Sequence, residues 1–353
     1  MKKTQSSFIS NQRGMVSVIV TMILIIVMTL VVLGMSQNSN REQRQALDRQ
    51  LSDQAFYNAE SGINDWAEYL YNERDNTAIP PVKDTCETTG YPGAPNPEID
   101  GPNGVNSYSC VLYDKAPLSL EYDTVTISDS IVTPIEPYGL PGGSTMQSLE
   151  FTWRAKDGST NVSGCNLSAT SPIPTALPGG CDVGGLRIDL VNPSGFNRDA
   201  MIQNNFPAYL LPSNGGGILN YRSGPVNEQG EIGRANCSGG VCRIVIGGLS
   251  LRNGERLYLH IKGLYKTTNL TIKSCRVPAA NCGAGNQVVR FNSSQIEIDS
   301  TGKSNDILRR VKVRLPVQSQ FENAGSFSLK TTQSICKLIR VEQNEATLDN
   351  RCQ

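Results

Sequence analysis

The chain has 353 residues, a length typical of roughly two to three structural units. With 38% hydrophobic and 18% charged residues it is neither a disordered polyelectrolyte nor a coiled-coil rod, and its 32 basic and 32 acidic residues exclude a globally basic nucleic-acid binder. A single histidine argues against a catalytic triad or a histidine-based zinc site, because either would have to use that one residue.

The composition changes abruptly after residue 72. The first 72 residues contain no proline, no cysteine and three glycines, whereas the remaining 281 hold all 19 prolines, all ten cysteines and 30 glycines. Because proline and glycine interrupt helices, the front predicts one long helix and the back predicts strands and turns. We therefore expect an α+β protein with a helix over 15–72, a Pro/Gly-rich linker over 73–105 and a disulfide-bonded, antiparallel β-rich domain of one or two parts over 106–353.

An uncharged apolar segment from Met15 to Met35 opens the helix. Its 21 residues would span ~31 Å as a helix, which is enough to cross a bilayer core. Lys2, Lys3 and Arg13 precede it, so the short N-terminus should stay cytoplasmic and the rest of this single-pass protein should be exported. A cleaved secretory signal is the alternative, but the apolar run exceeds the usual signal core and no small-residue cleavage site follows it cleanly.

The helical pattern continues on the exported side of this segment. Apolar residues recur every three or four positions, which places them on one face of a helix while charged residues occupy the other faces. This stripe consists of Leu47, Leu51, Ala55, Ala59, Ile63, Trp66 and Leu70. We expect it to pack against the β-rich domain. A stalk or coiled coil is the alternative, although the run is too short for many heptads.

Three features of this region occur in an order typical of one protein family. Gln12-Arg-Gly-Met15 ends a basic leader, an apolar run follows, and Gln54-Ala-Phe-Tyr-Asn-Ala-Glu-Ser-Gly-Ile63 lies on the exported half of the helix. This segment resembles the N-terminus of a type IV pilus minor pilin of the PilX kind, or of a general-secretion minor pseudopilin. The resemblance covers residues 10–65, under a fifth of the chain.

The resemblance implies a processing step and a set of partners. Prepilin peptidase would remove the leader, residues 1–14, by cutting between Gly14 and Met15, and would methylate the new N-terminus. Other pilin subunits, the membrane and the inner-membrane pilus assembly machinery would be the partners. After processing, the protein would reach the cell surface or the pilus.

Two positions depart from the major subunits of the family. Met15 stands where major pilins usually have Phe, and Ile19 stands where they have a Glu that is thought to pair with the N-terminal amine of a neighbouring subunit. An unpaired ammonium in lipid is costly, so a chain without this Glu is poorly suited to repetitive stacking. Minor subunits often lack it, and the resemblance therefore points to a minor pilin.

Short alternating segments follow the linker, separated by clusters of Gly, Asn, Pro and Ser. Alternation of apolar and polar residues predicts antiparallel strands with one buried face and one solvated face. The clearest segments are 108–113, 122–127, 149–154, 186–191, 242–246, 255–262, 269–274 and 308–315.

All ten cysteines lie in the part expected to be exported, where disulfides persist. Their spacing suggests local pairs, although ten cysteines allow about 945 schemes and sequence alone does not choose among them. The suggested pairs are Cys86–Cys110, Cys165–Cys181, Cys237–Cys242, Cys275–Cys282 and Cys336–Cys352. The last pair would fix the C-terminal tail, and the resemblance agrees, since type IV pilins often close a C-terminal loop in this way. Zinc fits poorly, because four residues separate Cys237 from Cys242.

Two strand faces carry residues that could have a chemical role. His260 alternates with Tyr258 and Lys262 on a face expected to be solvated, and a functional histidine is the alternative. Three basic residues, Arg310, Lys312 and Arg314, alternate with apolar ones. This basic stripe is expected to be a solvated strand face, and contact with phosphates or acidic glycans is the alternative.

Three loops carry weaker signals. Residues 299–306 and 156–161 resemble loose calcium loops, but both lack the full ligand spacing and the first contains a lysine. Residues 204–217, which include Tyr209 and several asparagines, predict an exposed loop that is either adhesive or structural.

We expect a structural, non-enzymatic subunit that primes, joins or tips a type IV pilus or a related filament, with no cofactor, no metal and no specific nucleic-acid partner. The sequence contains no Gly-x-Ser-x-Gly, phosphate-binding loop or zinc-protease pattern. One alternative is a permanently anchored module that binds a surface ligand. Another is an exported enzyme that acts on glycans through two carboxylates, although no pair of carboxylates is singled out.

Overall fold

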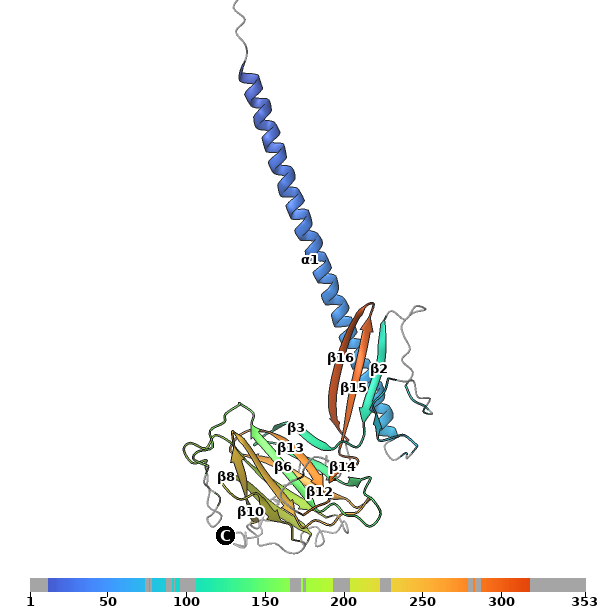
Figure 1. The fold of residues 1–353 in the computed structure, drawn as a ribbon, viewed down its shortest axis with the longest axis vertical. Helices are drawn as coiled ribbons and strands as arrows, with labels where there is room; N and C mark the ends of the chain where they lie inside the picture. Colours follow the sequence, from blue (N-terminus) through green and yellow to red (C-terminus); the bar gives the residue numbers. More distant parts are fainter. Residues whose placement is uncertain are drawn as a thin grey trace, which may run out of the picture. The chain divides into compact units, whose positions relative to one another are not determined.

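A computed structural model shows one long helix and two β-sheets (Figure 1). It describes residues 12–73, 76, 78–86, 91, 93–95, 106–165, 173, 176–192, 204–222, 230–278, 282 and 287–317. The chain divides into two compact units. The first unit contains the described parts of 1–64, 96–111 and 300–311, and the second contains those of 65–95, 112–299 and 312–353.

Helix α1 (Gln12–Asn72) confirms the predicted long N-terminal helix, which is drawn in blue in Figure 1. Its 61 residues correspond to ~92 Å of helix, and no proline interrupts them. The helix is long and apolar enough to cross a membrane. Every residue from Ser17 to Met35 is exposed, so this part of α1 makes no apolar core within the described chain.

Four strands form one sheet in the order β1-β2-β15-β16. They are β1 (Val82–Lys83), β2 (Asn106–Asp114), β15 (Gln295–Ser304) and β16 (Ile307–Pro316), and Figure 1 shows the last three side by side. The connection between β15 and β16 places Asn305 in the left-handed region, with φ at 52°. Asparagine tolerates this conformation better than most residues, which suits it to such a tight reversal.

The stretch expected to be a linker is partly built into this fold. Val82 and Lys83 of β1 pair with Asp114 and Tyr113 of β2, and Ile79 is 2% exposed. The Lys115 ammonium donates to Asn76 O at 3.0 Å. Within the described residues, therefore, the part of 73–105 around β1 is packed and hydrogen-bonded rather than a free connection.

Twelve strands form the second sheet, all of them in the second unit. They are β3 (Ser119–Val125), β4 (Ser130–Ile135), β5 (Pro137–Tyr138), β6 (Ser148–Ala155), β7 (Gly185–Val191), β8 (Asn205–Ser213), β9 (Ile218–Asn220), β10 (Glu231–Ser238), β11 (Val241–Gly247), β12 (Leu257–Leu264), β13 (Thr268–Cys275) and β14 (Val288–Phe291). Their order is β4-β12-β7-β8-β10-β11-β6-β13-β14-β5, with β3 also on β13 and β9 also on β11.

Most neighbours in this sheet are antiparallel, as predicted, but two pairs are parallel. Strand β10 runs parallel to β8, and β9 runs parallel to β11. The end of β3 meets the end of β12, where Gly263 N–H donates to Thr126 O at 2.8 Å, and this contact between strands from distant positions in the sheet shows that the sheet curls. The curled strands enclose one hydrophobic core, whose largest fully buried side chains include Trp153, Phe151 and Phe206.

Disulfides link cysteines that are near one another in sequence. Cys165 is joined to Cys181, Cys237 to Cys242, and Cys275 to Cys282. Cys86 and Cys110 are also disulfide-bonded. The bridges Cys165–Cys181, Cys237–Cys242 and Cys275–Cys282 are pairs that spacing suggested. The suggested pair Cys336–Cys352 lies outside the described residues and stays a prediction.

Candidate functional site

The predicted processing position lies at the start of α1. Gly14 and Met15 follow the first residue of the helix, Gln12, by two and three positions. The residues after them present an uncharged apolar surface on every side of the helix, since side chains from Val18 to Met35 are 47–68% exposed wherever they are large and apolar. Ile19 is 50% exposed, and the first acidic residue after it is Glu42. A helix with no charge on any face is suited to lipid or to other apolar helices.

Further along α1, small residues let a strand approach the helix backbone. A side chain added at Gly302 of β15 would collide with the backbone of Ala55 and Ala59, both of which are fully buried. One helical turn later, Gly62 faces Tyr108, whose Cγ would be 2.7 Å from an added Cβ. The small size of Ala55, Ala59 and Gly62 therefore has a direct steric explanation, because larger residues would push the strand away from the helix.

Polar contacts fix the same stretch of helix along its flanks. Asn58 Nδ2 donates to Lys303 O at 2.7 Å, and Ser304 Oγ donates to Gln54 Oε1 at 3.0 Å. Arg309 Nε donates to Ser52 Oγ at 2.8 Å. These bonds follow α1 as β15 turns into β16, so the hairpin holds the helix through both backbone contact and side-chain hydrogen bonds.

In the second unit, the last turns of α1 carry an aromatic cluster. Trp66 is 5% exposed and stacks on Tyr113, with ring centroids 5.4 Å apart and planes inclined by 30°. Tyr69 meets it edge-on at 5.5 Å, and Lys83 Nζ lies 4.9 Å from the centre of the Trp66 ring. Burial lowers the pKa of the Lys83 ammonium, and the electron-rich indole face partly offsets that cost.

The predicted helical stripe is buried along most of its length but not throughout. Ala55, Ala59, Ile63, Trp66 and Leu70 are at most 5% exposed, and Leu51 is half-buried. Leu47, in contrast, is 54% exposed. Contrary to the prediction, Leu47 is therefore not packed against the described part of the chain, and the half-buried Leu51 is the first residue of the stripe that is partly covered.

His260 is less solvated than expected. Its side chain is 25% exposed, and Nδ1 lies 3.6 Å from Oδ2 of Asp189, a carboxylate that is 1% exposed on the neighbouring strand. Arg187 Nε lies 3.6 Å from the same oxygen. The predicted alternation along β12 is present, with Leu257, Leu259 and Ile261 buried. The histidine thus lies beside the Arg187–Asp189 pair on the sheet and is partly covered rather than freely solvated.

Two of the three residues of the basic stripe on β16, Lys312 and Arg314, are paired with acidic neighbours. Lys312 Nζ lies 2.5 Å from Glu297, and Arg314 lies 2.7 Å from Glu297 and 3.2 Å from Glu121. Arg310 also has an interaction partner. Because Lys312 and Arg314 are paired with carboxylates, these two side chains offer little attraction to phosphates or acidic glycans.

The two segments that resemble loose calcium loops, 156–161 and 299–306, make contacts of other kinds. In 156–161, the Asp157 carboxylate accepts from Ser159 N–H at 2.9 Å and lies 3.5 Å from Lys266 Nζ. In 299–306, Asp299 belongs to β15. Across the described residues, no group of three or more His, Cys, Asp or Glu side chains could hold a metal ion.

Residues 204–217 are mostly strand, so the prediction of an exposed loop is wrong. Strand β8 covers Asn205–Ser213, and its inward-facing Phe206, Ala208 and Leu210 are fully buried. Pro207 and Pro212 suggested a loop, but Pro207 lies opposite Asp189 of β7, and Pro212 opposite Ala235 of β10. The apolar run Ala208-Tyr-Leu-Leu211 between the prolines was the signal that could have indicated a buried strand.

Comparison with known proteins bears on α1. A family model described as PilX N-terminal matches residues 13–64. Neither the curated proteins nor the solved structures contain a match to the chain. The matched segment includes both the uncharged half of α1 and the small-residue contact with β15. The N-terminal helix of this chain is therefore similar to that of the PilX-like type IV pilins.

Proposed function

We propose that this protein is a minor pilin-like subunit of a type IV pilus or a related filament. The observation that carries the proposal is the match of residues 13–64 to the PilX N-terminal family, on a helix whose uncharged half follows Gly14 directly. Removal of the leader, which contains Lys2, Lys3 and Arg13, would leave a mature end without basic side chains. The helix could then exchange lipid for a bundle of neighbouring pilin helices, because both surroundings are apolar.

Within such a filament the chain is suited to a rare position rather than a repeating one. Ile19 offers no carboxylate to the N-terminal ammonium of a neighbour, and no acidic residue precedes Glu42. Repetitive stacking would leave that ammonium unpaired in an apolar bundle. We infer a role in priming, at the tip or in adhesion, with the β-rich part exported and the inner-membrane assembly machinery and prepilin peptidase as partners. The role is structural and involves no catalysis.

N-terminal sequencing of the mature protein, with mass spectrometry for N-methylation, tests the proposal. We expect the mature chain to begin with N-methylated Met15, and Gly14→Val to leave a full-length precursor in the membrane. Gly34→Val is the matched control, because an added side chain at Gly34 has no atom within 4 Å and lies beyond the cut. Normal processing of Gly14→Val would overturn the proposal and would favour a permanently anchored surface module.

The composition of the filament tests the proposal that this protein occupies few positions in it. Quantitative mass spectrometry of sheared filaments should place this protein far below the main subunit. Restoring the carboxylate with Ile19→Glu should raise its proportion, whereas Ile23→Glu, one turn further along, should not. Finding the unmodified protein as the dominant filament component would contradict the argument from Ile19.

A further inference from the structure

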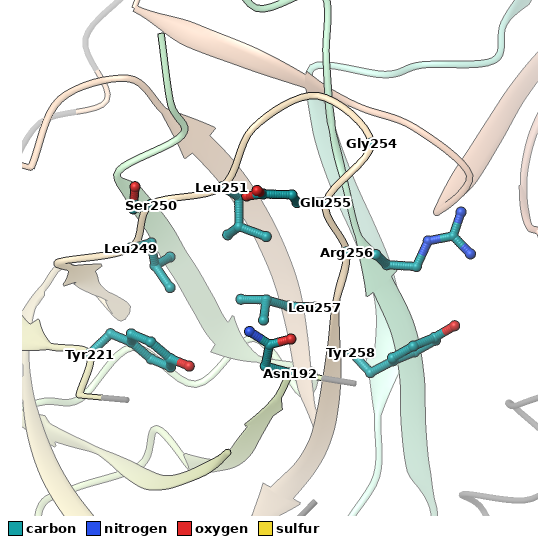
Figure 2. A pocket seen from close by; sticks show the side chains of 10 residues that line it. All are labelled: Asn192, Tyr221, Leu249, Ser250, Leu251, Gly254, Glu255, Arg256, Leu257 and Tyr258. Atoms are coloured by element: carbon teal, nitrogen blue, oxygen red, sulfur yellow. The ribbon is translucent and has the colours of Figure 1, made fainter. Parts of the chain in front are cut away.

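A cavity of about 740 Å³ lies within the second unit, and Figure 2 shows the side chains that line it. Its size falls within the range of small-molecule sites, which run from roughly 300 to 1,000 Å³. Leu249, Leu251 and Leu257 supply apolar side chains that are 3–5% exposed. Figure 2 shows the Asn192 amide beneath Leu257 and the Tyr221 hydroxyl turned toward that amide. An apolar surface thus meets two neutral hydrogen-bonding groups.

The walls of the cavity are fixed by the fold. Leu251 and Met146 exchange two backbone hydrogen bonds, of 2.8 and 3.1 Å, and Leu249 N–H donates to Gln147 O at 3.0 Å. The turn at the rim is held by Asn253, whose side chain accepts from Leu140 N–H at 3.1 Å and donates to Leu140 O at 3.0 Å. These bonds prepare the site before any ligand arrives, which reduces the ordering cost of binding.

The ring of Tyr221 is also held in place. Phe206, which is fully buried, lies 5.3 Å from it between ring centroids, and Tyr221 N–H donates to Gly247 O at 2.7 Å. Burial raises the pKa of the Tyr221 phenol, so its hydroxyl is neutral at physiological pH and acts as donor and acceptor.

The charges at the rim leave no free cation. Arg256 is the one basic side chain among the described lining residues, and its guanidinium donates to Glu136 Oε2 at 2.8 and 2.6 Å. Figure 2 shows Arg256 pointing away from the three leucines. Glu255 lies beside Leu251 at the rim, and one of its carboxylate oxygens accepts from Arg252 N–H at 2.9 Å. The site therefore does not attract anions, and its one acidic group can accept hydrogen bonds from hydroxyls.

We propose that this cavity binds a neutral saccharide. A pyranose ring has an apolar face of C–H groups, which matches the leucine side chains, and a rim of hydroxyls, which matches Asn192, Tyr221 and Glu255. A purely apolar ligand would cover the Asn192 amide and the Tyr221 phenol without offering either of them a hydrogen bond. An acidic sugar would place a second carboxylate near Glu255. The proposal concerns the β-rich part alone, so it stands or falls independently of processing and filament assembly.

Saturation-transfer NMR and titration on the full chain test the proposal. The protein should be kept in lauryldimethylamine oxide micelles, because sugar-headed detergents would compete for the site. The probes are the methyl glycosides of glucose, galactose and mannose, free N-acetylglucosamine, and glucuronic acid as the acidic comparator. We expect at least one neutral probe to bind, and glucuronic acid to bind at least tenfold more weakly than the best of them.

Conservative variants locate the binding. Asn192→Ala and Tyr221→Phe should each raise the dissociation constant of the best neutral probe about tenfold, the size expected for losing one buried hydrogen bond. Asn269→Ala on β13 and Tyr209→Phe on β8 are matched controls outside the cavity and should leave it unchanged. Unaltered circular dichroism keeps the variants comparable. Absence of binding by every neutral probe, equal binding of glucuronic acid, or unchanged affinity in both cavity variants would overturn the proposal.

Discussion

The two halves of α1 are continuous in sequence and structure but differ in what covers them. From Val18 to Met35 the helix is uncharged and exposed on every face, whereas between Ala55 and Leu70 one stripe is buried and the other faces carry mostly charged or polar residues, with Phe56 and Tyr57 exposed among them. A helix that is apolar all round needs an apolar surrounding outside the chain, and an amphipathic one needs a partner surface within it. The difference teaches that the first half is suited to an apolar surrounding outside the chain, while the second half is packed within it.

The strongest test of the second half is Trp66→Ala. Removing a ring that is 5% exposed and stacked on Tyr113 leaves a cavity, and we expect the free energy of unfolding to fall by about 4 kcal/mol. Tyr57→Ala, at a position 66% exposed on the same helix, is the matched control and should change it by less than about 0.5 kcal/mol. Guanidinium unfolding followed by circular dichroism measures both, and equal effects would remove the distinction between covered and uncovered faces.

The first half should show the opposite behaviour. Val27→Lys places a charge near the middle of the apolar run and should disfavour membrane insertion by about 3 kcal/mol, while the unfolding of the β-rich part stays unchanged. Gln37→Lys, at the end of the run, should insert normally because a terminal lysine reaches the interface. Carbonate extraction of membranes reports the inserted fraction. Full insertion of Val27→Lys would show that this half of α1 is not lipid-exposed.

A third substitution tests the close approach of strand and helix. Gly302→Ala adds one carbon atom against the backbone of Ala55 and Ala59, which cannot move as a side-chain tip can, so we expect a loss of about 2 kcal/mol in unfolding free energy. Gly142→Ala is the control, because its added carbon would meet no atom within 4 Å. If both variants unfold at the same denaturant concentration, the contact between β15 and α1 is looser than described.

Periodicity in the sequence predicted the parts of the fold that depend on neighbours along the chain. The length of α1, the alternation along β12 and the antiparallel character of most strands all follow from patterns of three to four or of two residues. Short separations between cysteines suggested the bridges Cys165–Cys181 and Cys237–Cys242, which the structure contains.

Features that join distant segments could not be predicted in this way. Gly302 in a strand reads as a turn signal, and nothing local shows that it faces Ala59, which lies far away in the sequence. The parallel pairing of β8 with β10 depends on the choice of partner rather than on composition. The cavity brings together Asn192, Tyr221 and Leu251 from three separate segments, so no motif marks it.

The smallest expected effect on folding, and the sharpest test of the comparison, is at Leu47. This residue belongs to the predicted apolar stripe yet is 54% exposed, whereas Leu51, the next residue of the stripe, is half-buried. Leu47→Gln should therefore change the free energy of unfolding by less than about 0.5 kcal/mol. If neighbouring subunits cover Leu47 in a filament, the same variant should enter sheared filaments less often than the unmodified chain, as counted by mass spectrometry. Arg49→Gln, on another face, controls for the introduced amide. Strong destabilisation of the isolated Leu47→Gln chain would show instead that the chain itself covers this position, and would move the boundary between the two halves of α1 toward the membrane.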